Sequence, residues 1–221
     1  MIADASNFVV TVNDAFIFVV AVSVFFLALI TVLMVVFVIK YNSKRVKKAT
    51  NIRGNLPLEI TWTIIPTLLV LIMFWVGWNG YKEMAHAPKD SMNIDVTAQM
   101  WQWKFKYNNG KESDTLYIPL NKDVNFRLHS LDVDHSFFIP DFRIKKDVIP
   151  NRTNTVWFRP EKLGEYVLTC AEYCGLRHSY MRAVVKVMPE SSFTAWLNGN
   201  ENINIASDDS SSNKHKEEDD K

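Results

Sequence analysis

The sequence predicts a two-helix transmembrane hairpin at the N-terminus, followed by an all-β domain of the sandwich or barrel type. Two long runs without a charged residue lie in the first third of the chain, at residues 15–39 and 60–81. A cluster of Lys and Arg separates these runs. From residue 94 onward, short segments alternate between apolar and polar residues, which is typical of strands with one buried face.

The first uncharged run, residues 15–39, follows a short outer segment of residues 1–14 that has no Lys or Arg. About 20 apolar residues suffice to cross a bilayer, so this run is long enough to be a membrane span. It is not typical of a secretory signal peptide, because no basic residue precedes it and it is too long for the apolar core of one. With 221 residues, the chain has room for one anchor and one ordinary domain, and its net charge of +1 does not indicate a nucleic-acid partner.

The second uncharged run completes the hairpin of residues 15–81, and Pro66 lies early in it, where a proline can kink a helix. A hydrophobic hairpin inside a large soluble protein is the alternative, but the rest of the chain is too small to cover one. The loop 40–54 between the spans is predicted to be cytoplasmic by the positive-inside rule, which places both termini outside. Its basic residues are Lys40, Lys44, Arg45, Lys47, Lys48 and Arg53.

A polar linker at residues 82–93 leads to the predicted β domain, residues 94–198. Many short strands at this spacing favour a sandwich or barrel, closed by a short helix at residues 191–198. The tail, residues 199–221, is polar and of low complexity, and is predicted to be disordered. The clearest predicted strands are 94–98, 101–107, 124–128, 155–158, 165–169 and 183–187.

Both cysteines of the chain, Cys170 and Cys174, lie in one twelve-residue loop together with His178 and Met181. Thiolate, imidazole and thioether form the soft ligand set that selects copper. Two thiolates four residues apart can both bridge between two metal ions. Such a site needs another imidazole from elsewhere in the chain, and His135 is the candidate.

The cysteine loop has two other interpretations. A disulfide between Cys170 and Cys174 would close so short a loop that it would constrain little, and it would leave the His and Met spacing unexplained. Zinc suits two Cys and two His, but Met181 would then be idle. The remaining histidines, His86, His129 and His215, are expected to be ordinary linker, strand and tail residues.

The loop resembles the dinuclear copper (CuA) loop of subunit II of the haem–copper oxidases, C-x-E-x-C-G-x-x-H-x-x-M. The segment from Asp132 to Arg152 resembles the family's other characteristic stretch, V-x-H-S-F-x-x-P followed by K-x-D-x-I-P, although Asn151 stands where glycine is usual. The late copper loop and the upstream histidine fit a cupredoxin-like, Greek-key domain. By this resemblance, Cys170 and Cys174 would bridge the two coppers of the CuA pair, and His135 and His178 would each bind one copper. Met181 would be a weak ligand, and the backbone carbonyl of Glu172 another.

The resemblance also implies roles outside the copper loop. Trp101 matches the tryptophan through which cytochrome c delivers its electron; otherwise Trp101 and Trp103 are packing aromatics on one face of a strand. Glu59 matches the glutamate at the mouth of the K proton pathway, or is simply an interfacial charge. The Glu172 side chain would bind magnesium at the boundary with subunit I, the alternative being a solvent-facing loop residue.

The resemblance therefore implies subunit II of a cytochrome c oxidase, anchored in lipid in the plasma (inner) membrane with its copper domain on the outer, periplasmic side. Electrons would pass from cytochrome c, or a similar one-electron donor, to haem in subunit I for reduction of O2 coupled to proton pumping. Acidic residues such as Asp132 and Asp134 would aid the encounter with the donor. Subunit III is a further expected partner, and haem belongs to subunit I alone. The alternatives are the copper subunit of a nitric oxide reductase and a membrane-tethered copper-carrying module; a quinol oxidase subunit would lack both cysteines.

Overall fold

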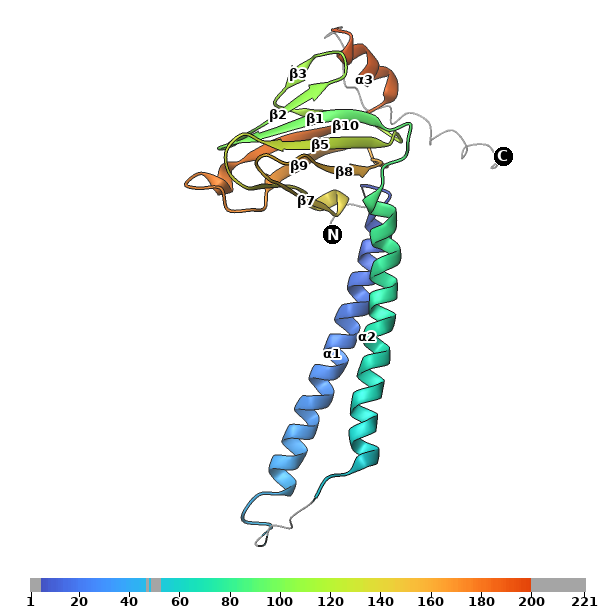
Figure 1. The fold of residues 1–221 in the computed structure, drawn as a ribbon, viewed down its shortest axis with the longest axis vertical. Helices are drawn as coiled ribbons and strands as arrows, with labels where there is room; N and C mark the ends of the chain where they lie inside the picture. The colour runs from blue at the N-terminus through green and yellow to red at the C-terminus, as the bar shows by residue number, and fades with distance from the viewer. Residues whose placement is uncertain (1–4, 47, 49–52, 200–221) are drawn as a thin grey trace, which may run out of the picture.

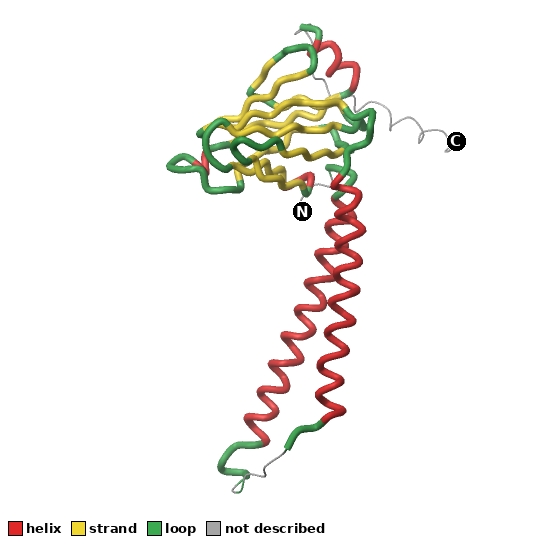
Figure 2. The backbone as a smooth tube through the Cα atoms, viewed as in Figure 1, coloured by secondary structure: helices red, strands yellow, loops and turns green. Residues whose placement is uncertain are grey.

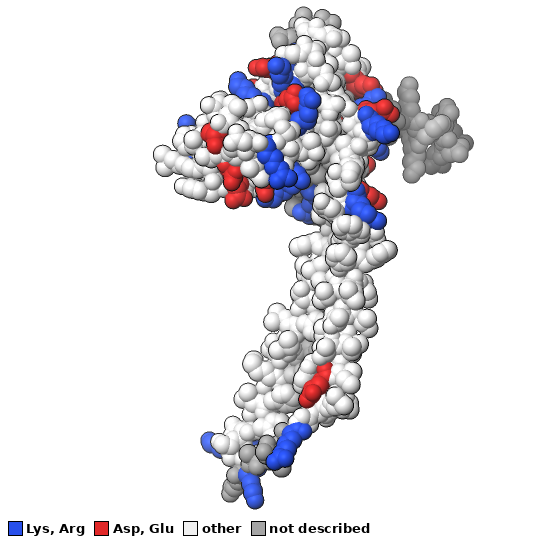
Figure 3. Space-filling model, viewed as in Figure 1, with Lys and Arg blue, Asp and Glu red and all other residues white. Residues whose placement is uncertain are grey.

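Two long antiparallel helices form a stalk that carries a β domain at one end, as the computed structural model shows (Figure 1). The structure describes residues 5–46, 48 and 53–199. Helix α1 spans Val9–Lys40 and α2 spans Leu56–Ala85, and both are long and apolar enough to cross a membrane. The surface of the helical pair is almost free of charge along its length, and Lys and Arg gather at its far end (Figure 3).

The start of α2 is fixed by reciprocal capping. The Asn55 side chain accepts a hydrogen bond from the Leu58 N–H at 3.1 Å, and the Glu59 carboxylate accepts one from the Asn55 N–H at 3.3 Å. These contacts satisfy backbone donors that have no partner within the helix. The helix then continues through Pro66 to Ala85 without interruption.

The β domain is a sandwich of two five-stranded sheets, drawn in yellow in Figure 2. The first has the order β3-β2-β1-β5-β8, and the second has the order β4-β10-β9-β6-β7. Strands β1 and β5 pair in parallel, as do β4 and β10, whereas the other pairs are antiparallel. The strands are β1 (Met92–Gln99), β2 (Gln102–Tyr107), β3 (Glu112–Ser113), β4 (Leu116–Pro119), β5 (Val124–Ser130), β6 (His135–Ile139), β7 (Ile144–Val148), β8 (Asn154–Phe158), β9 (Gly164–Cys170) and β10 (Arg182–Met188).

Alternating apolar residues of both sheets fill the space between them. In β2, every second residue from Trp103 to Tyr107 is buried, and the residues between them are exposed. Aromatic rings dominate the centre, where Phe126 contacts both Phe137 and Phe158 at centroid distances of 5.4 and 5.0 Å. The short helix α3 (Glu190–Leu197) covers one end, with Phe193 buried.

The stalk and the domain are joined by buried contacts. Phe8, at the start of α1, packs edge-on against Trp157 of β8 with 4.8 Å between ring centroids. The Trp157 indole donates to the Glu83 carbonyl near the end of α2 at 3.2 Å. Ser6 bridges to Pro160 and donates its hydroxyl to the Phe142 carbonyl at 2.8 Å. The domain therefore rests on both helices and on the segment that precedes them.

The predicted fold class is confirmed: a two-helix apolar hairpin precedes an all-β, cupredoxin-like domain. Each predicted strand overlaps an observed one, although β2 begins after Trp101. Helix α3 lies within one residue of the closing helix predicted at residues 191–198. α2 reaches Ala85 and β1 begins at Met92, so the connection is residues 86–91. The predicted disorder of the tail and His215 concern residues 200–221, outside the described part, as does Lys47 of the basic loop.

Strands β3, β4, β6 and β7 are not among the clearest strands predicted from the sequence. Strand β6 does not alternate, because four of its five residues are buried, and β7 has three consecutive exposed polar residues. The turn after β7 accommodates Asn151 in the position where glycine is usual, and the φ of Asn151 is 60°. Asparagine adopts this left-handed conformation more readily than most residues do.

Candidate metal centre

The ligand candidates meet where three strands of the second sheet end. His135 is the first residue of β6, Cys170 is the last of β9, and Met181 directly precedes β10. Two backbone hydrogen bonds fix this junction, from the Cys170 N–H to the Met181 carbonyl and from the Ala171 N–H to the Ser136 carbonyl, both 3.1 Å. The intervening loop, drawn in orange in Figure 1, projects from the left side of the sandwich, whereas the stalk joins the domain at its lower right.

Three other side chains and one carbonyl surround the two sulfur atoms of the cysteines. The Cys170 Sγ lies 3.8 Å from the Cys174 Sγ, 3.8 Å from the His135 Nδ1 and 3.2 Å from the Glu172 carbonyl oxygen. The Cys174 Sγ lies 3.5 Å from the His178 Nδ1 and 3.7 Å from the Met181 Sδ. Each sulfur thus has its own imidazole, and the structure brings together all six predicted ligands.

The centre is shielded from water on the side of the sheet. His135 and Met181 have no exposed surface, and Cys170 and Cys174 are buried. His178, in the single 3-10 turn η2 (His178–Tyr180), is half-buried at the outer side. Among the candidate ligand side chains, His178 is thus the most open to solvent.

His135 is oriented by Asp132. Its Nε2 lies 2.8 Å from Asp132 Oδ1, which leaves Nδ1 facing Cys170. Burial lowers the pKa of His135, but the contacts with Cys170 and Asp132 outweigh burial and raise the pKa overall. Burial raises the pKa of Asp132, but hydrogen bonds from the Met100 N–H, His135 and the Val133 N–H lower it overall. The sequence did not predict that Asp132 would face inward and contact His135. An acidic residue three positions before a candidate ligand is the only signal of this contact in the sequence.

The two thiols differ in acidity. Burial raises the pKa of Cys170, but hydrogen bonds, led by the one with His135, outweigh burial and lower it. The pKa of Cys174 is raised, because burial and the neighbouring Cys170 thiolate both disfavour a second negative charge. Holding both sulfurs as thiolates therefore calls for a cation between them.

The chemistry of this donor set fits copper. Both cysteines are free thiols, and their sulfurs are much farther apart than the roughly 2.05 Å of a disulfide bond. Zinc sites use Cys, His and carboxylate, whereas the fully buried Met181 thioether adds a soft donor that copper accepts. Two thiolates between two imidazoles can bridge a pair of ions, so the residues present suit a dinuclear centre.

Trp101 and Trp103 occupy different places. Trp101 lies in the turn before β2, half-buried, and its Nε1 donates to the Cys174 carbonyl at 3.1 Å. Its ring covers Gly175, where an added Cβ would lie 3.4 Å from the Trp101 Cζ2. Trp103 is buried in the core, edge-on to His135 with 6.3 Å between ring centroids. Of these two tryptophans, Trp101 is therefore the one that contacts the metal loop and is partly exposed.

The other predicted positions lie apart from this cluster. Glu59 is exposed in the first turn of α2, where it caps Asn55. The Glu172 side chain is exposed on the metal loop. His129 lies in β5 and His86 directly follows α2, as expected of ordinary residues.

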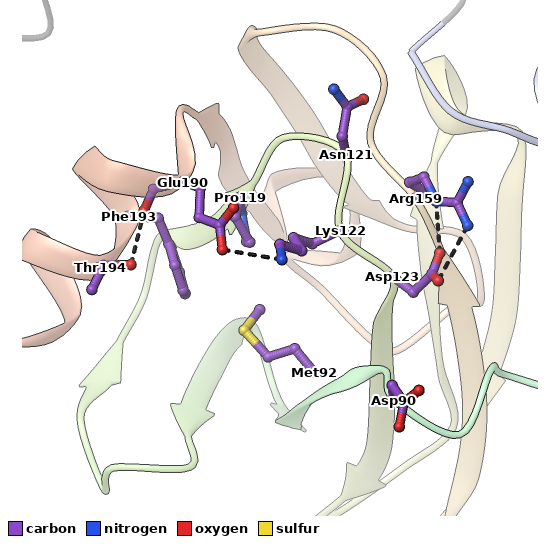
Figure 4. Close-up of a pocket in the computed structure, with 10 residues that line it drawn as sticks. All are labelled: Asp90, Met92, Pro119, Asn121, Lys122, Asp123, Arg159, Glu190, Phe193 and Thr194. Carbon is purple, nitrogen blue, oxygen red and sulfur yellow. Dashed lines mark hydrogen bonds and ion pairs between the residues drawn. The ribbon is translucent and has the colours of Figure 1, made fainter.

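A separate depression of about 480 Å³ lies between α3 and the start of β5 (Figure 4). Its basic side chains are already paired: Lys122 with Glu190 at 3.1 Å, and Arg159 with Asp123 at 2.8 Å. None of the residues that line it is a Cys or His. The metal-ligand chemistry of the described residues is thus concentrated at the Cys170–Cys174 loop.

Comparison with known proteins gives a consistent result. The family model described as "Cytochrome C oxidase subunit II, periplasmic domain" matches residues 104–188, and "Cytochrome C oxidase subunit II, transmembrane domain" matches residues 3–76. The chain is 30% identical to cytochrome c oxidase subunit 2 of Thermostichus vulcanus over 78% of this chain and 70% of that protein. It is 27% identical to the Cereibacter sphaeroides subunit over 83% of this chain and 73% of that protein.

A solved structure, the periplasmic domain of subunit II of cytochrome oxidase from Bradyrhizobium japonicum, is also similar. It is 29% identical and covers 51% of this chain and 95% of its own, with a TM-score of 0.48.

Proposed function

Because the chain belongs to the cytochrome c oxidase subunit II family, we propose that it accepts electrons from cytochrome c at a dinuclear CuA centre. It passes them to haem in subunit I, where O2 is reduced to water and protons are pumped. Family membership makes the chain a membrane protein with a periplasmic domain and a subunit of an oxidoreductase. The donor, the copper centre and the partner subunits are the proposal.

The observation that carries this proposal is the buried cluster of His135, Cys170 and Cys174, whose ligand atoms lie within 4.8 Å of one another. His178 and Met181 extend the cluster at the Cys174 side. The residues that would hold a copper pair are Cys170, Cys174, His135, His178 and Met181, together with the Glu172 carbonyl. When bound, the copper pair supplies reversible one-electron chemistry.

The protein's contribution to electron transfer is rigidity. Three of the candidate ligands lie at strand ends, since His135 begins β6, Cys170 ends β9 and Met181 directly precedes β10. Strand β9 is hydrogen-bonded to both β6 and β10. Burial of His135, Cys170, Cys174 and Met181 keeps water from the centre, so few groups need to reorient when the charge changes. A set of ligands that moves little suits rapid electron transfer.

Trp101 is the proposed point of electron uptake, because its half-exposed ring covers Gly175 and its indole bonds the Cys174 carbonyl. The exposed Glu172 carboxylate fits magnesium as one hard ligand among several waters and partner groups, since Mg²⁺ usually takes one or two protein carboxylates. Glu59, at the start of α2, is proposed at the mouth of the K proton pathway. Its exposed position at the basic end of the stalk supports this role.

The stalk is proposed to cross the plasma (inner) membrane, with the basic loop in the cytoplasm and residues 94–198 forming the periplasmic copper domain. The gathering of Lys and Arg at the far end of the helices supports this orientation (Figure 3). Subunits I and III would cover the apolar helix surfaces together with lipid.

The test is purification of the full chain from the membrane with its partners. We expect two coppers per chain and an electron paramagnetic resonance spectrum in which one unpaired electron is shared by both coppers. A haem-bearing subunit should co-purify, and reduced cytochrome c should support O2 consumption. One copper per chain with a single-copper spectrum would contradict the dinuclear centre, and reduction of nitric oxide in place of O2 would contradict the oxidase assignment.

A further inference from the structure

The carboxylate of Asp132 lies between the proposed electron-uptake turn and a copper ligand. Its Oδ1 lies 2.8 Å from the His135 Nε2 and accepts the Val133 N–H at 2.7 Å. Its Oδ2 accepts the Met100 N–H, also at 2.7 Å. Only 20% of the side chain is exposed, so both oxygens are used inside the protein.

Met100 directly precedes Trp101, so the contact with Asp132 fixes the backbone that carries the indole. The ring itself is held from the other side, by the hydrogen bond to the Cys174 carbonyl and by contact with Gly175. Trp101 is therefore tied to both halves of the copper cluster. One connection leads through Asp132 to His135, and the other leads directly to Cys174.

Asp134 offers a contrast two residues away. It is exposed, and within the described chain its carboxylate makes no hydrogen bond or ion pair. A carboxylate of this kind is free to attract a basic partner through the solvent, with an effect that salt screens. The two neighbouring acids thus differ in what they contact, although the sequence alone suggests the same docking role for both.

We propose that Asp132 is a positioning residue for electron uptake, which holds the Met100–Trp101 turn and the His135 ring in one fixed arrangement. The inference rests on the proposed function, because it assumes that His135 binds copper and that Trp101 receives the electron. Groups that orient a metal-bound histidine through its second nitrogen commonly have large effects on the site, of about 10- to 100-fold in affinity or activity. The additional step here is that the same carboxylate also holds the aromatic residue through which the electron arrives.

The experiment compares Asp132→Ala and Asp132→Asn with the matched control Asp134→Asn, each in the assembled oxidase. Alanine removes both connections. Asparagine keeps the size of the side chain but has one acceptor oxygen in place of two, so it can serve His135 or Met100 and not both. Copper content, the copper resonance spectrum, and the KM and saturating rate for reduced cytochrome c are measured for each protein.

For Asp132→Ala we expect altered copper hyperfine splittings and a saturating rate about 10- to 100-fold lower, with KM changed less than the rate. Asp132→Asn should change either the spectrum or the saturating rate. Asp134→Asn should leave both at the wild-type values and raise KM at low salt only.

The inference is overturned if Asp132→Asn has the wild-type spectrum and saturating rate, or if Asp132→Ala changes KM alone as a docking residue would. Should Asp132→Ala fail to assemble, Asp132→Asn decides the question by itself. Failure of the proposed function has a different appearance, because the wild-type and Asp134→Asn proteins would then also lack the dinuclear copper signal or fail to oxidise cytochrome c.

Discussion

Trp101 combines two properties that substitutions can separate: an aromatic ring against the copper loop and an N–H donor to the Cys174 carbonyl. Trp101→Phe keeps an aromatic ring and removes the donor. Trp101→Gln keeps an N–H donor and removes the ring. If the ring carries the electron, the glutamine variant should be much slower than the phenylalanine variant at saturating donor.

The size of the smaller effect follows from the hydrogen bond. A neutral hydrogen bond of ordinary length, here 3.1 Å, has a net value of about 0.5–1.5 kcal/mol. If that energy keeps the ring against Gly175, its loss in Trp101→Phe lowers the ratio of seated to unseated ring by roughly 2- to 12-fold, at about 1.4 kcal/mol per factor of ten. We therefore expect Trp101→Phe to lose at most about this factor in rate, and Trp101→Gln to lose more.

The assay is rapid mixing of reduced cytochrome c with the oxidised, assembled enzyme, with the rate followed over donor concentration to separate KM from the saturating rate. Copper content and thermal unfolding serve as controls for an intact domain. An unchanged saturating rate in Trp101→Gln would make Trp101 a packing residue. A phenylalanine variant as slow as the glutamine variant would assign the effect to the hydrogen bond.

Further substitutions and conditions test the metal site, the orientation and the stability of the domain. Cys174→Ser should lose the spectrum of two coupled coppers and give a single-copper or empty site, and an unchanged spectrum would exclude Cys174 as a bridge. Glu172→Gln should retain both coppers, because the backbone carbonyl is kept, but should weaken manganese bound in place of magnesium; an unaltered manganese resonance would show that this side chain is no ligand. Protease added to intact, outward-facing cells should degrade residues 90–200, and their protection would reverse the proposed orientation. The Asp147 pKa is lowered mainly by hydrogen bonds from Lys145 and a buried serine, so its stabilisation is present above the unfolded value near 3.8 and is lost as pH falls through the lower folded value. Asp147→Asn should therefore reduce the loss of unfolding free energy at acid pH, by less than about 1 kcal/mol because the side chain is half exposed. The same dependence of unfolding free energy on pH in both proteins would contradict this explanation.

The sequence predicts much of the copper site because ligand chemistry restricts which residues can meet. Two cysteines, a histidine and a methionine in twelve residues define most of a soft-metal site, and the missing imidazole identifies His135. The uncharged runs predict the stalk for a similar reason, since a membrane core permits few alternatives to an apolar helix.

What the sequence does not predict depends on contacts between distant segments. Asp132 and Asp134 look alike in the sequence, and only the fold places a backbone N–H and an imidazole around one of them. Strand β6 lacks alternation because residues on both of its faces are buried, which its own sequence does not reveal. Trp101 and Trp103 follow an alternating pattern, yet β2 begins between them and separates their environments.

The segment before α1 has a consequence for biosynthesis. Ser6 bonds the Phe142 carbonyl, 136 residues later, and the Arg159 N–H donates to the Asn7 side chain across a separation of 152 residues. Ser6 and Asn7 are therefore synthesised well before their partners, which follow both spans in the chain. Only a hairpin inserted with its N-terminus on the same side as the domain can supply Phe8 to cover Trp157. A chain in which only one of the two spans has inserted would hold Phe8 and Trp157 on opposite sides of the membrane, so completion of the core distinguishes a complete hairpin from a half-inserted one.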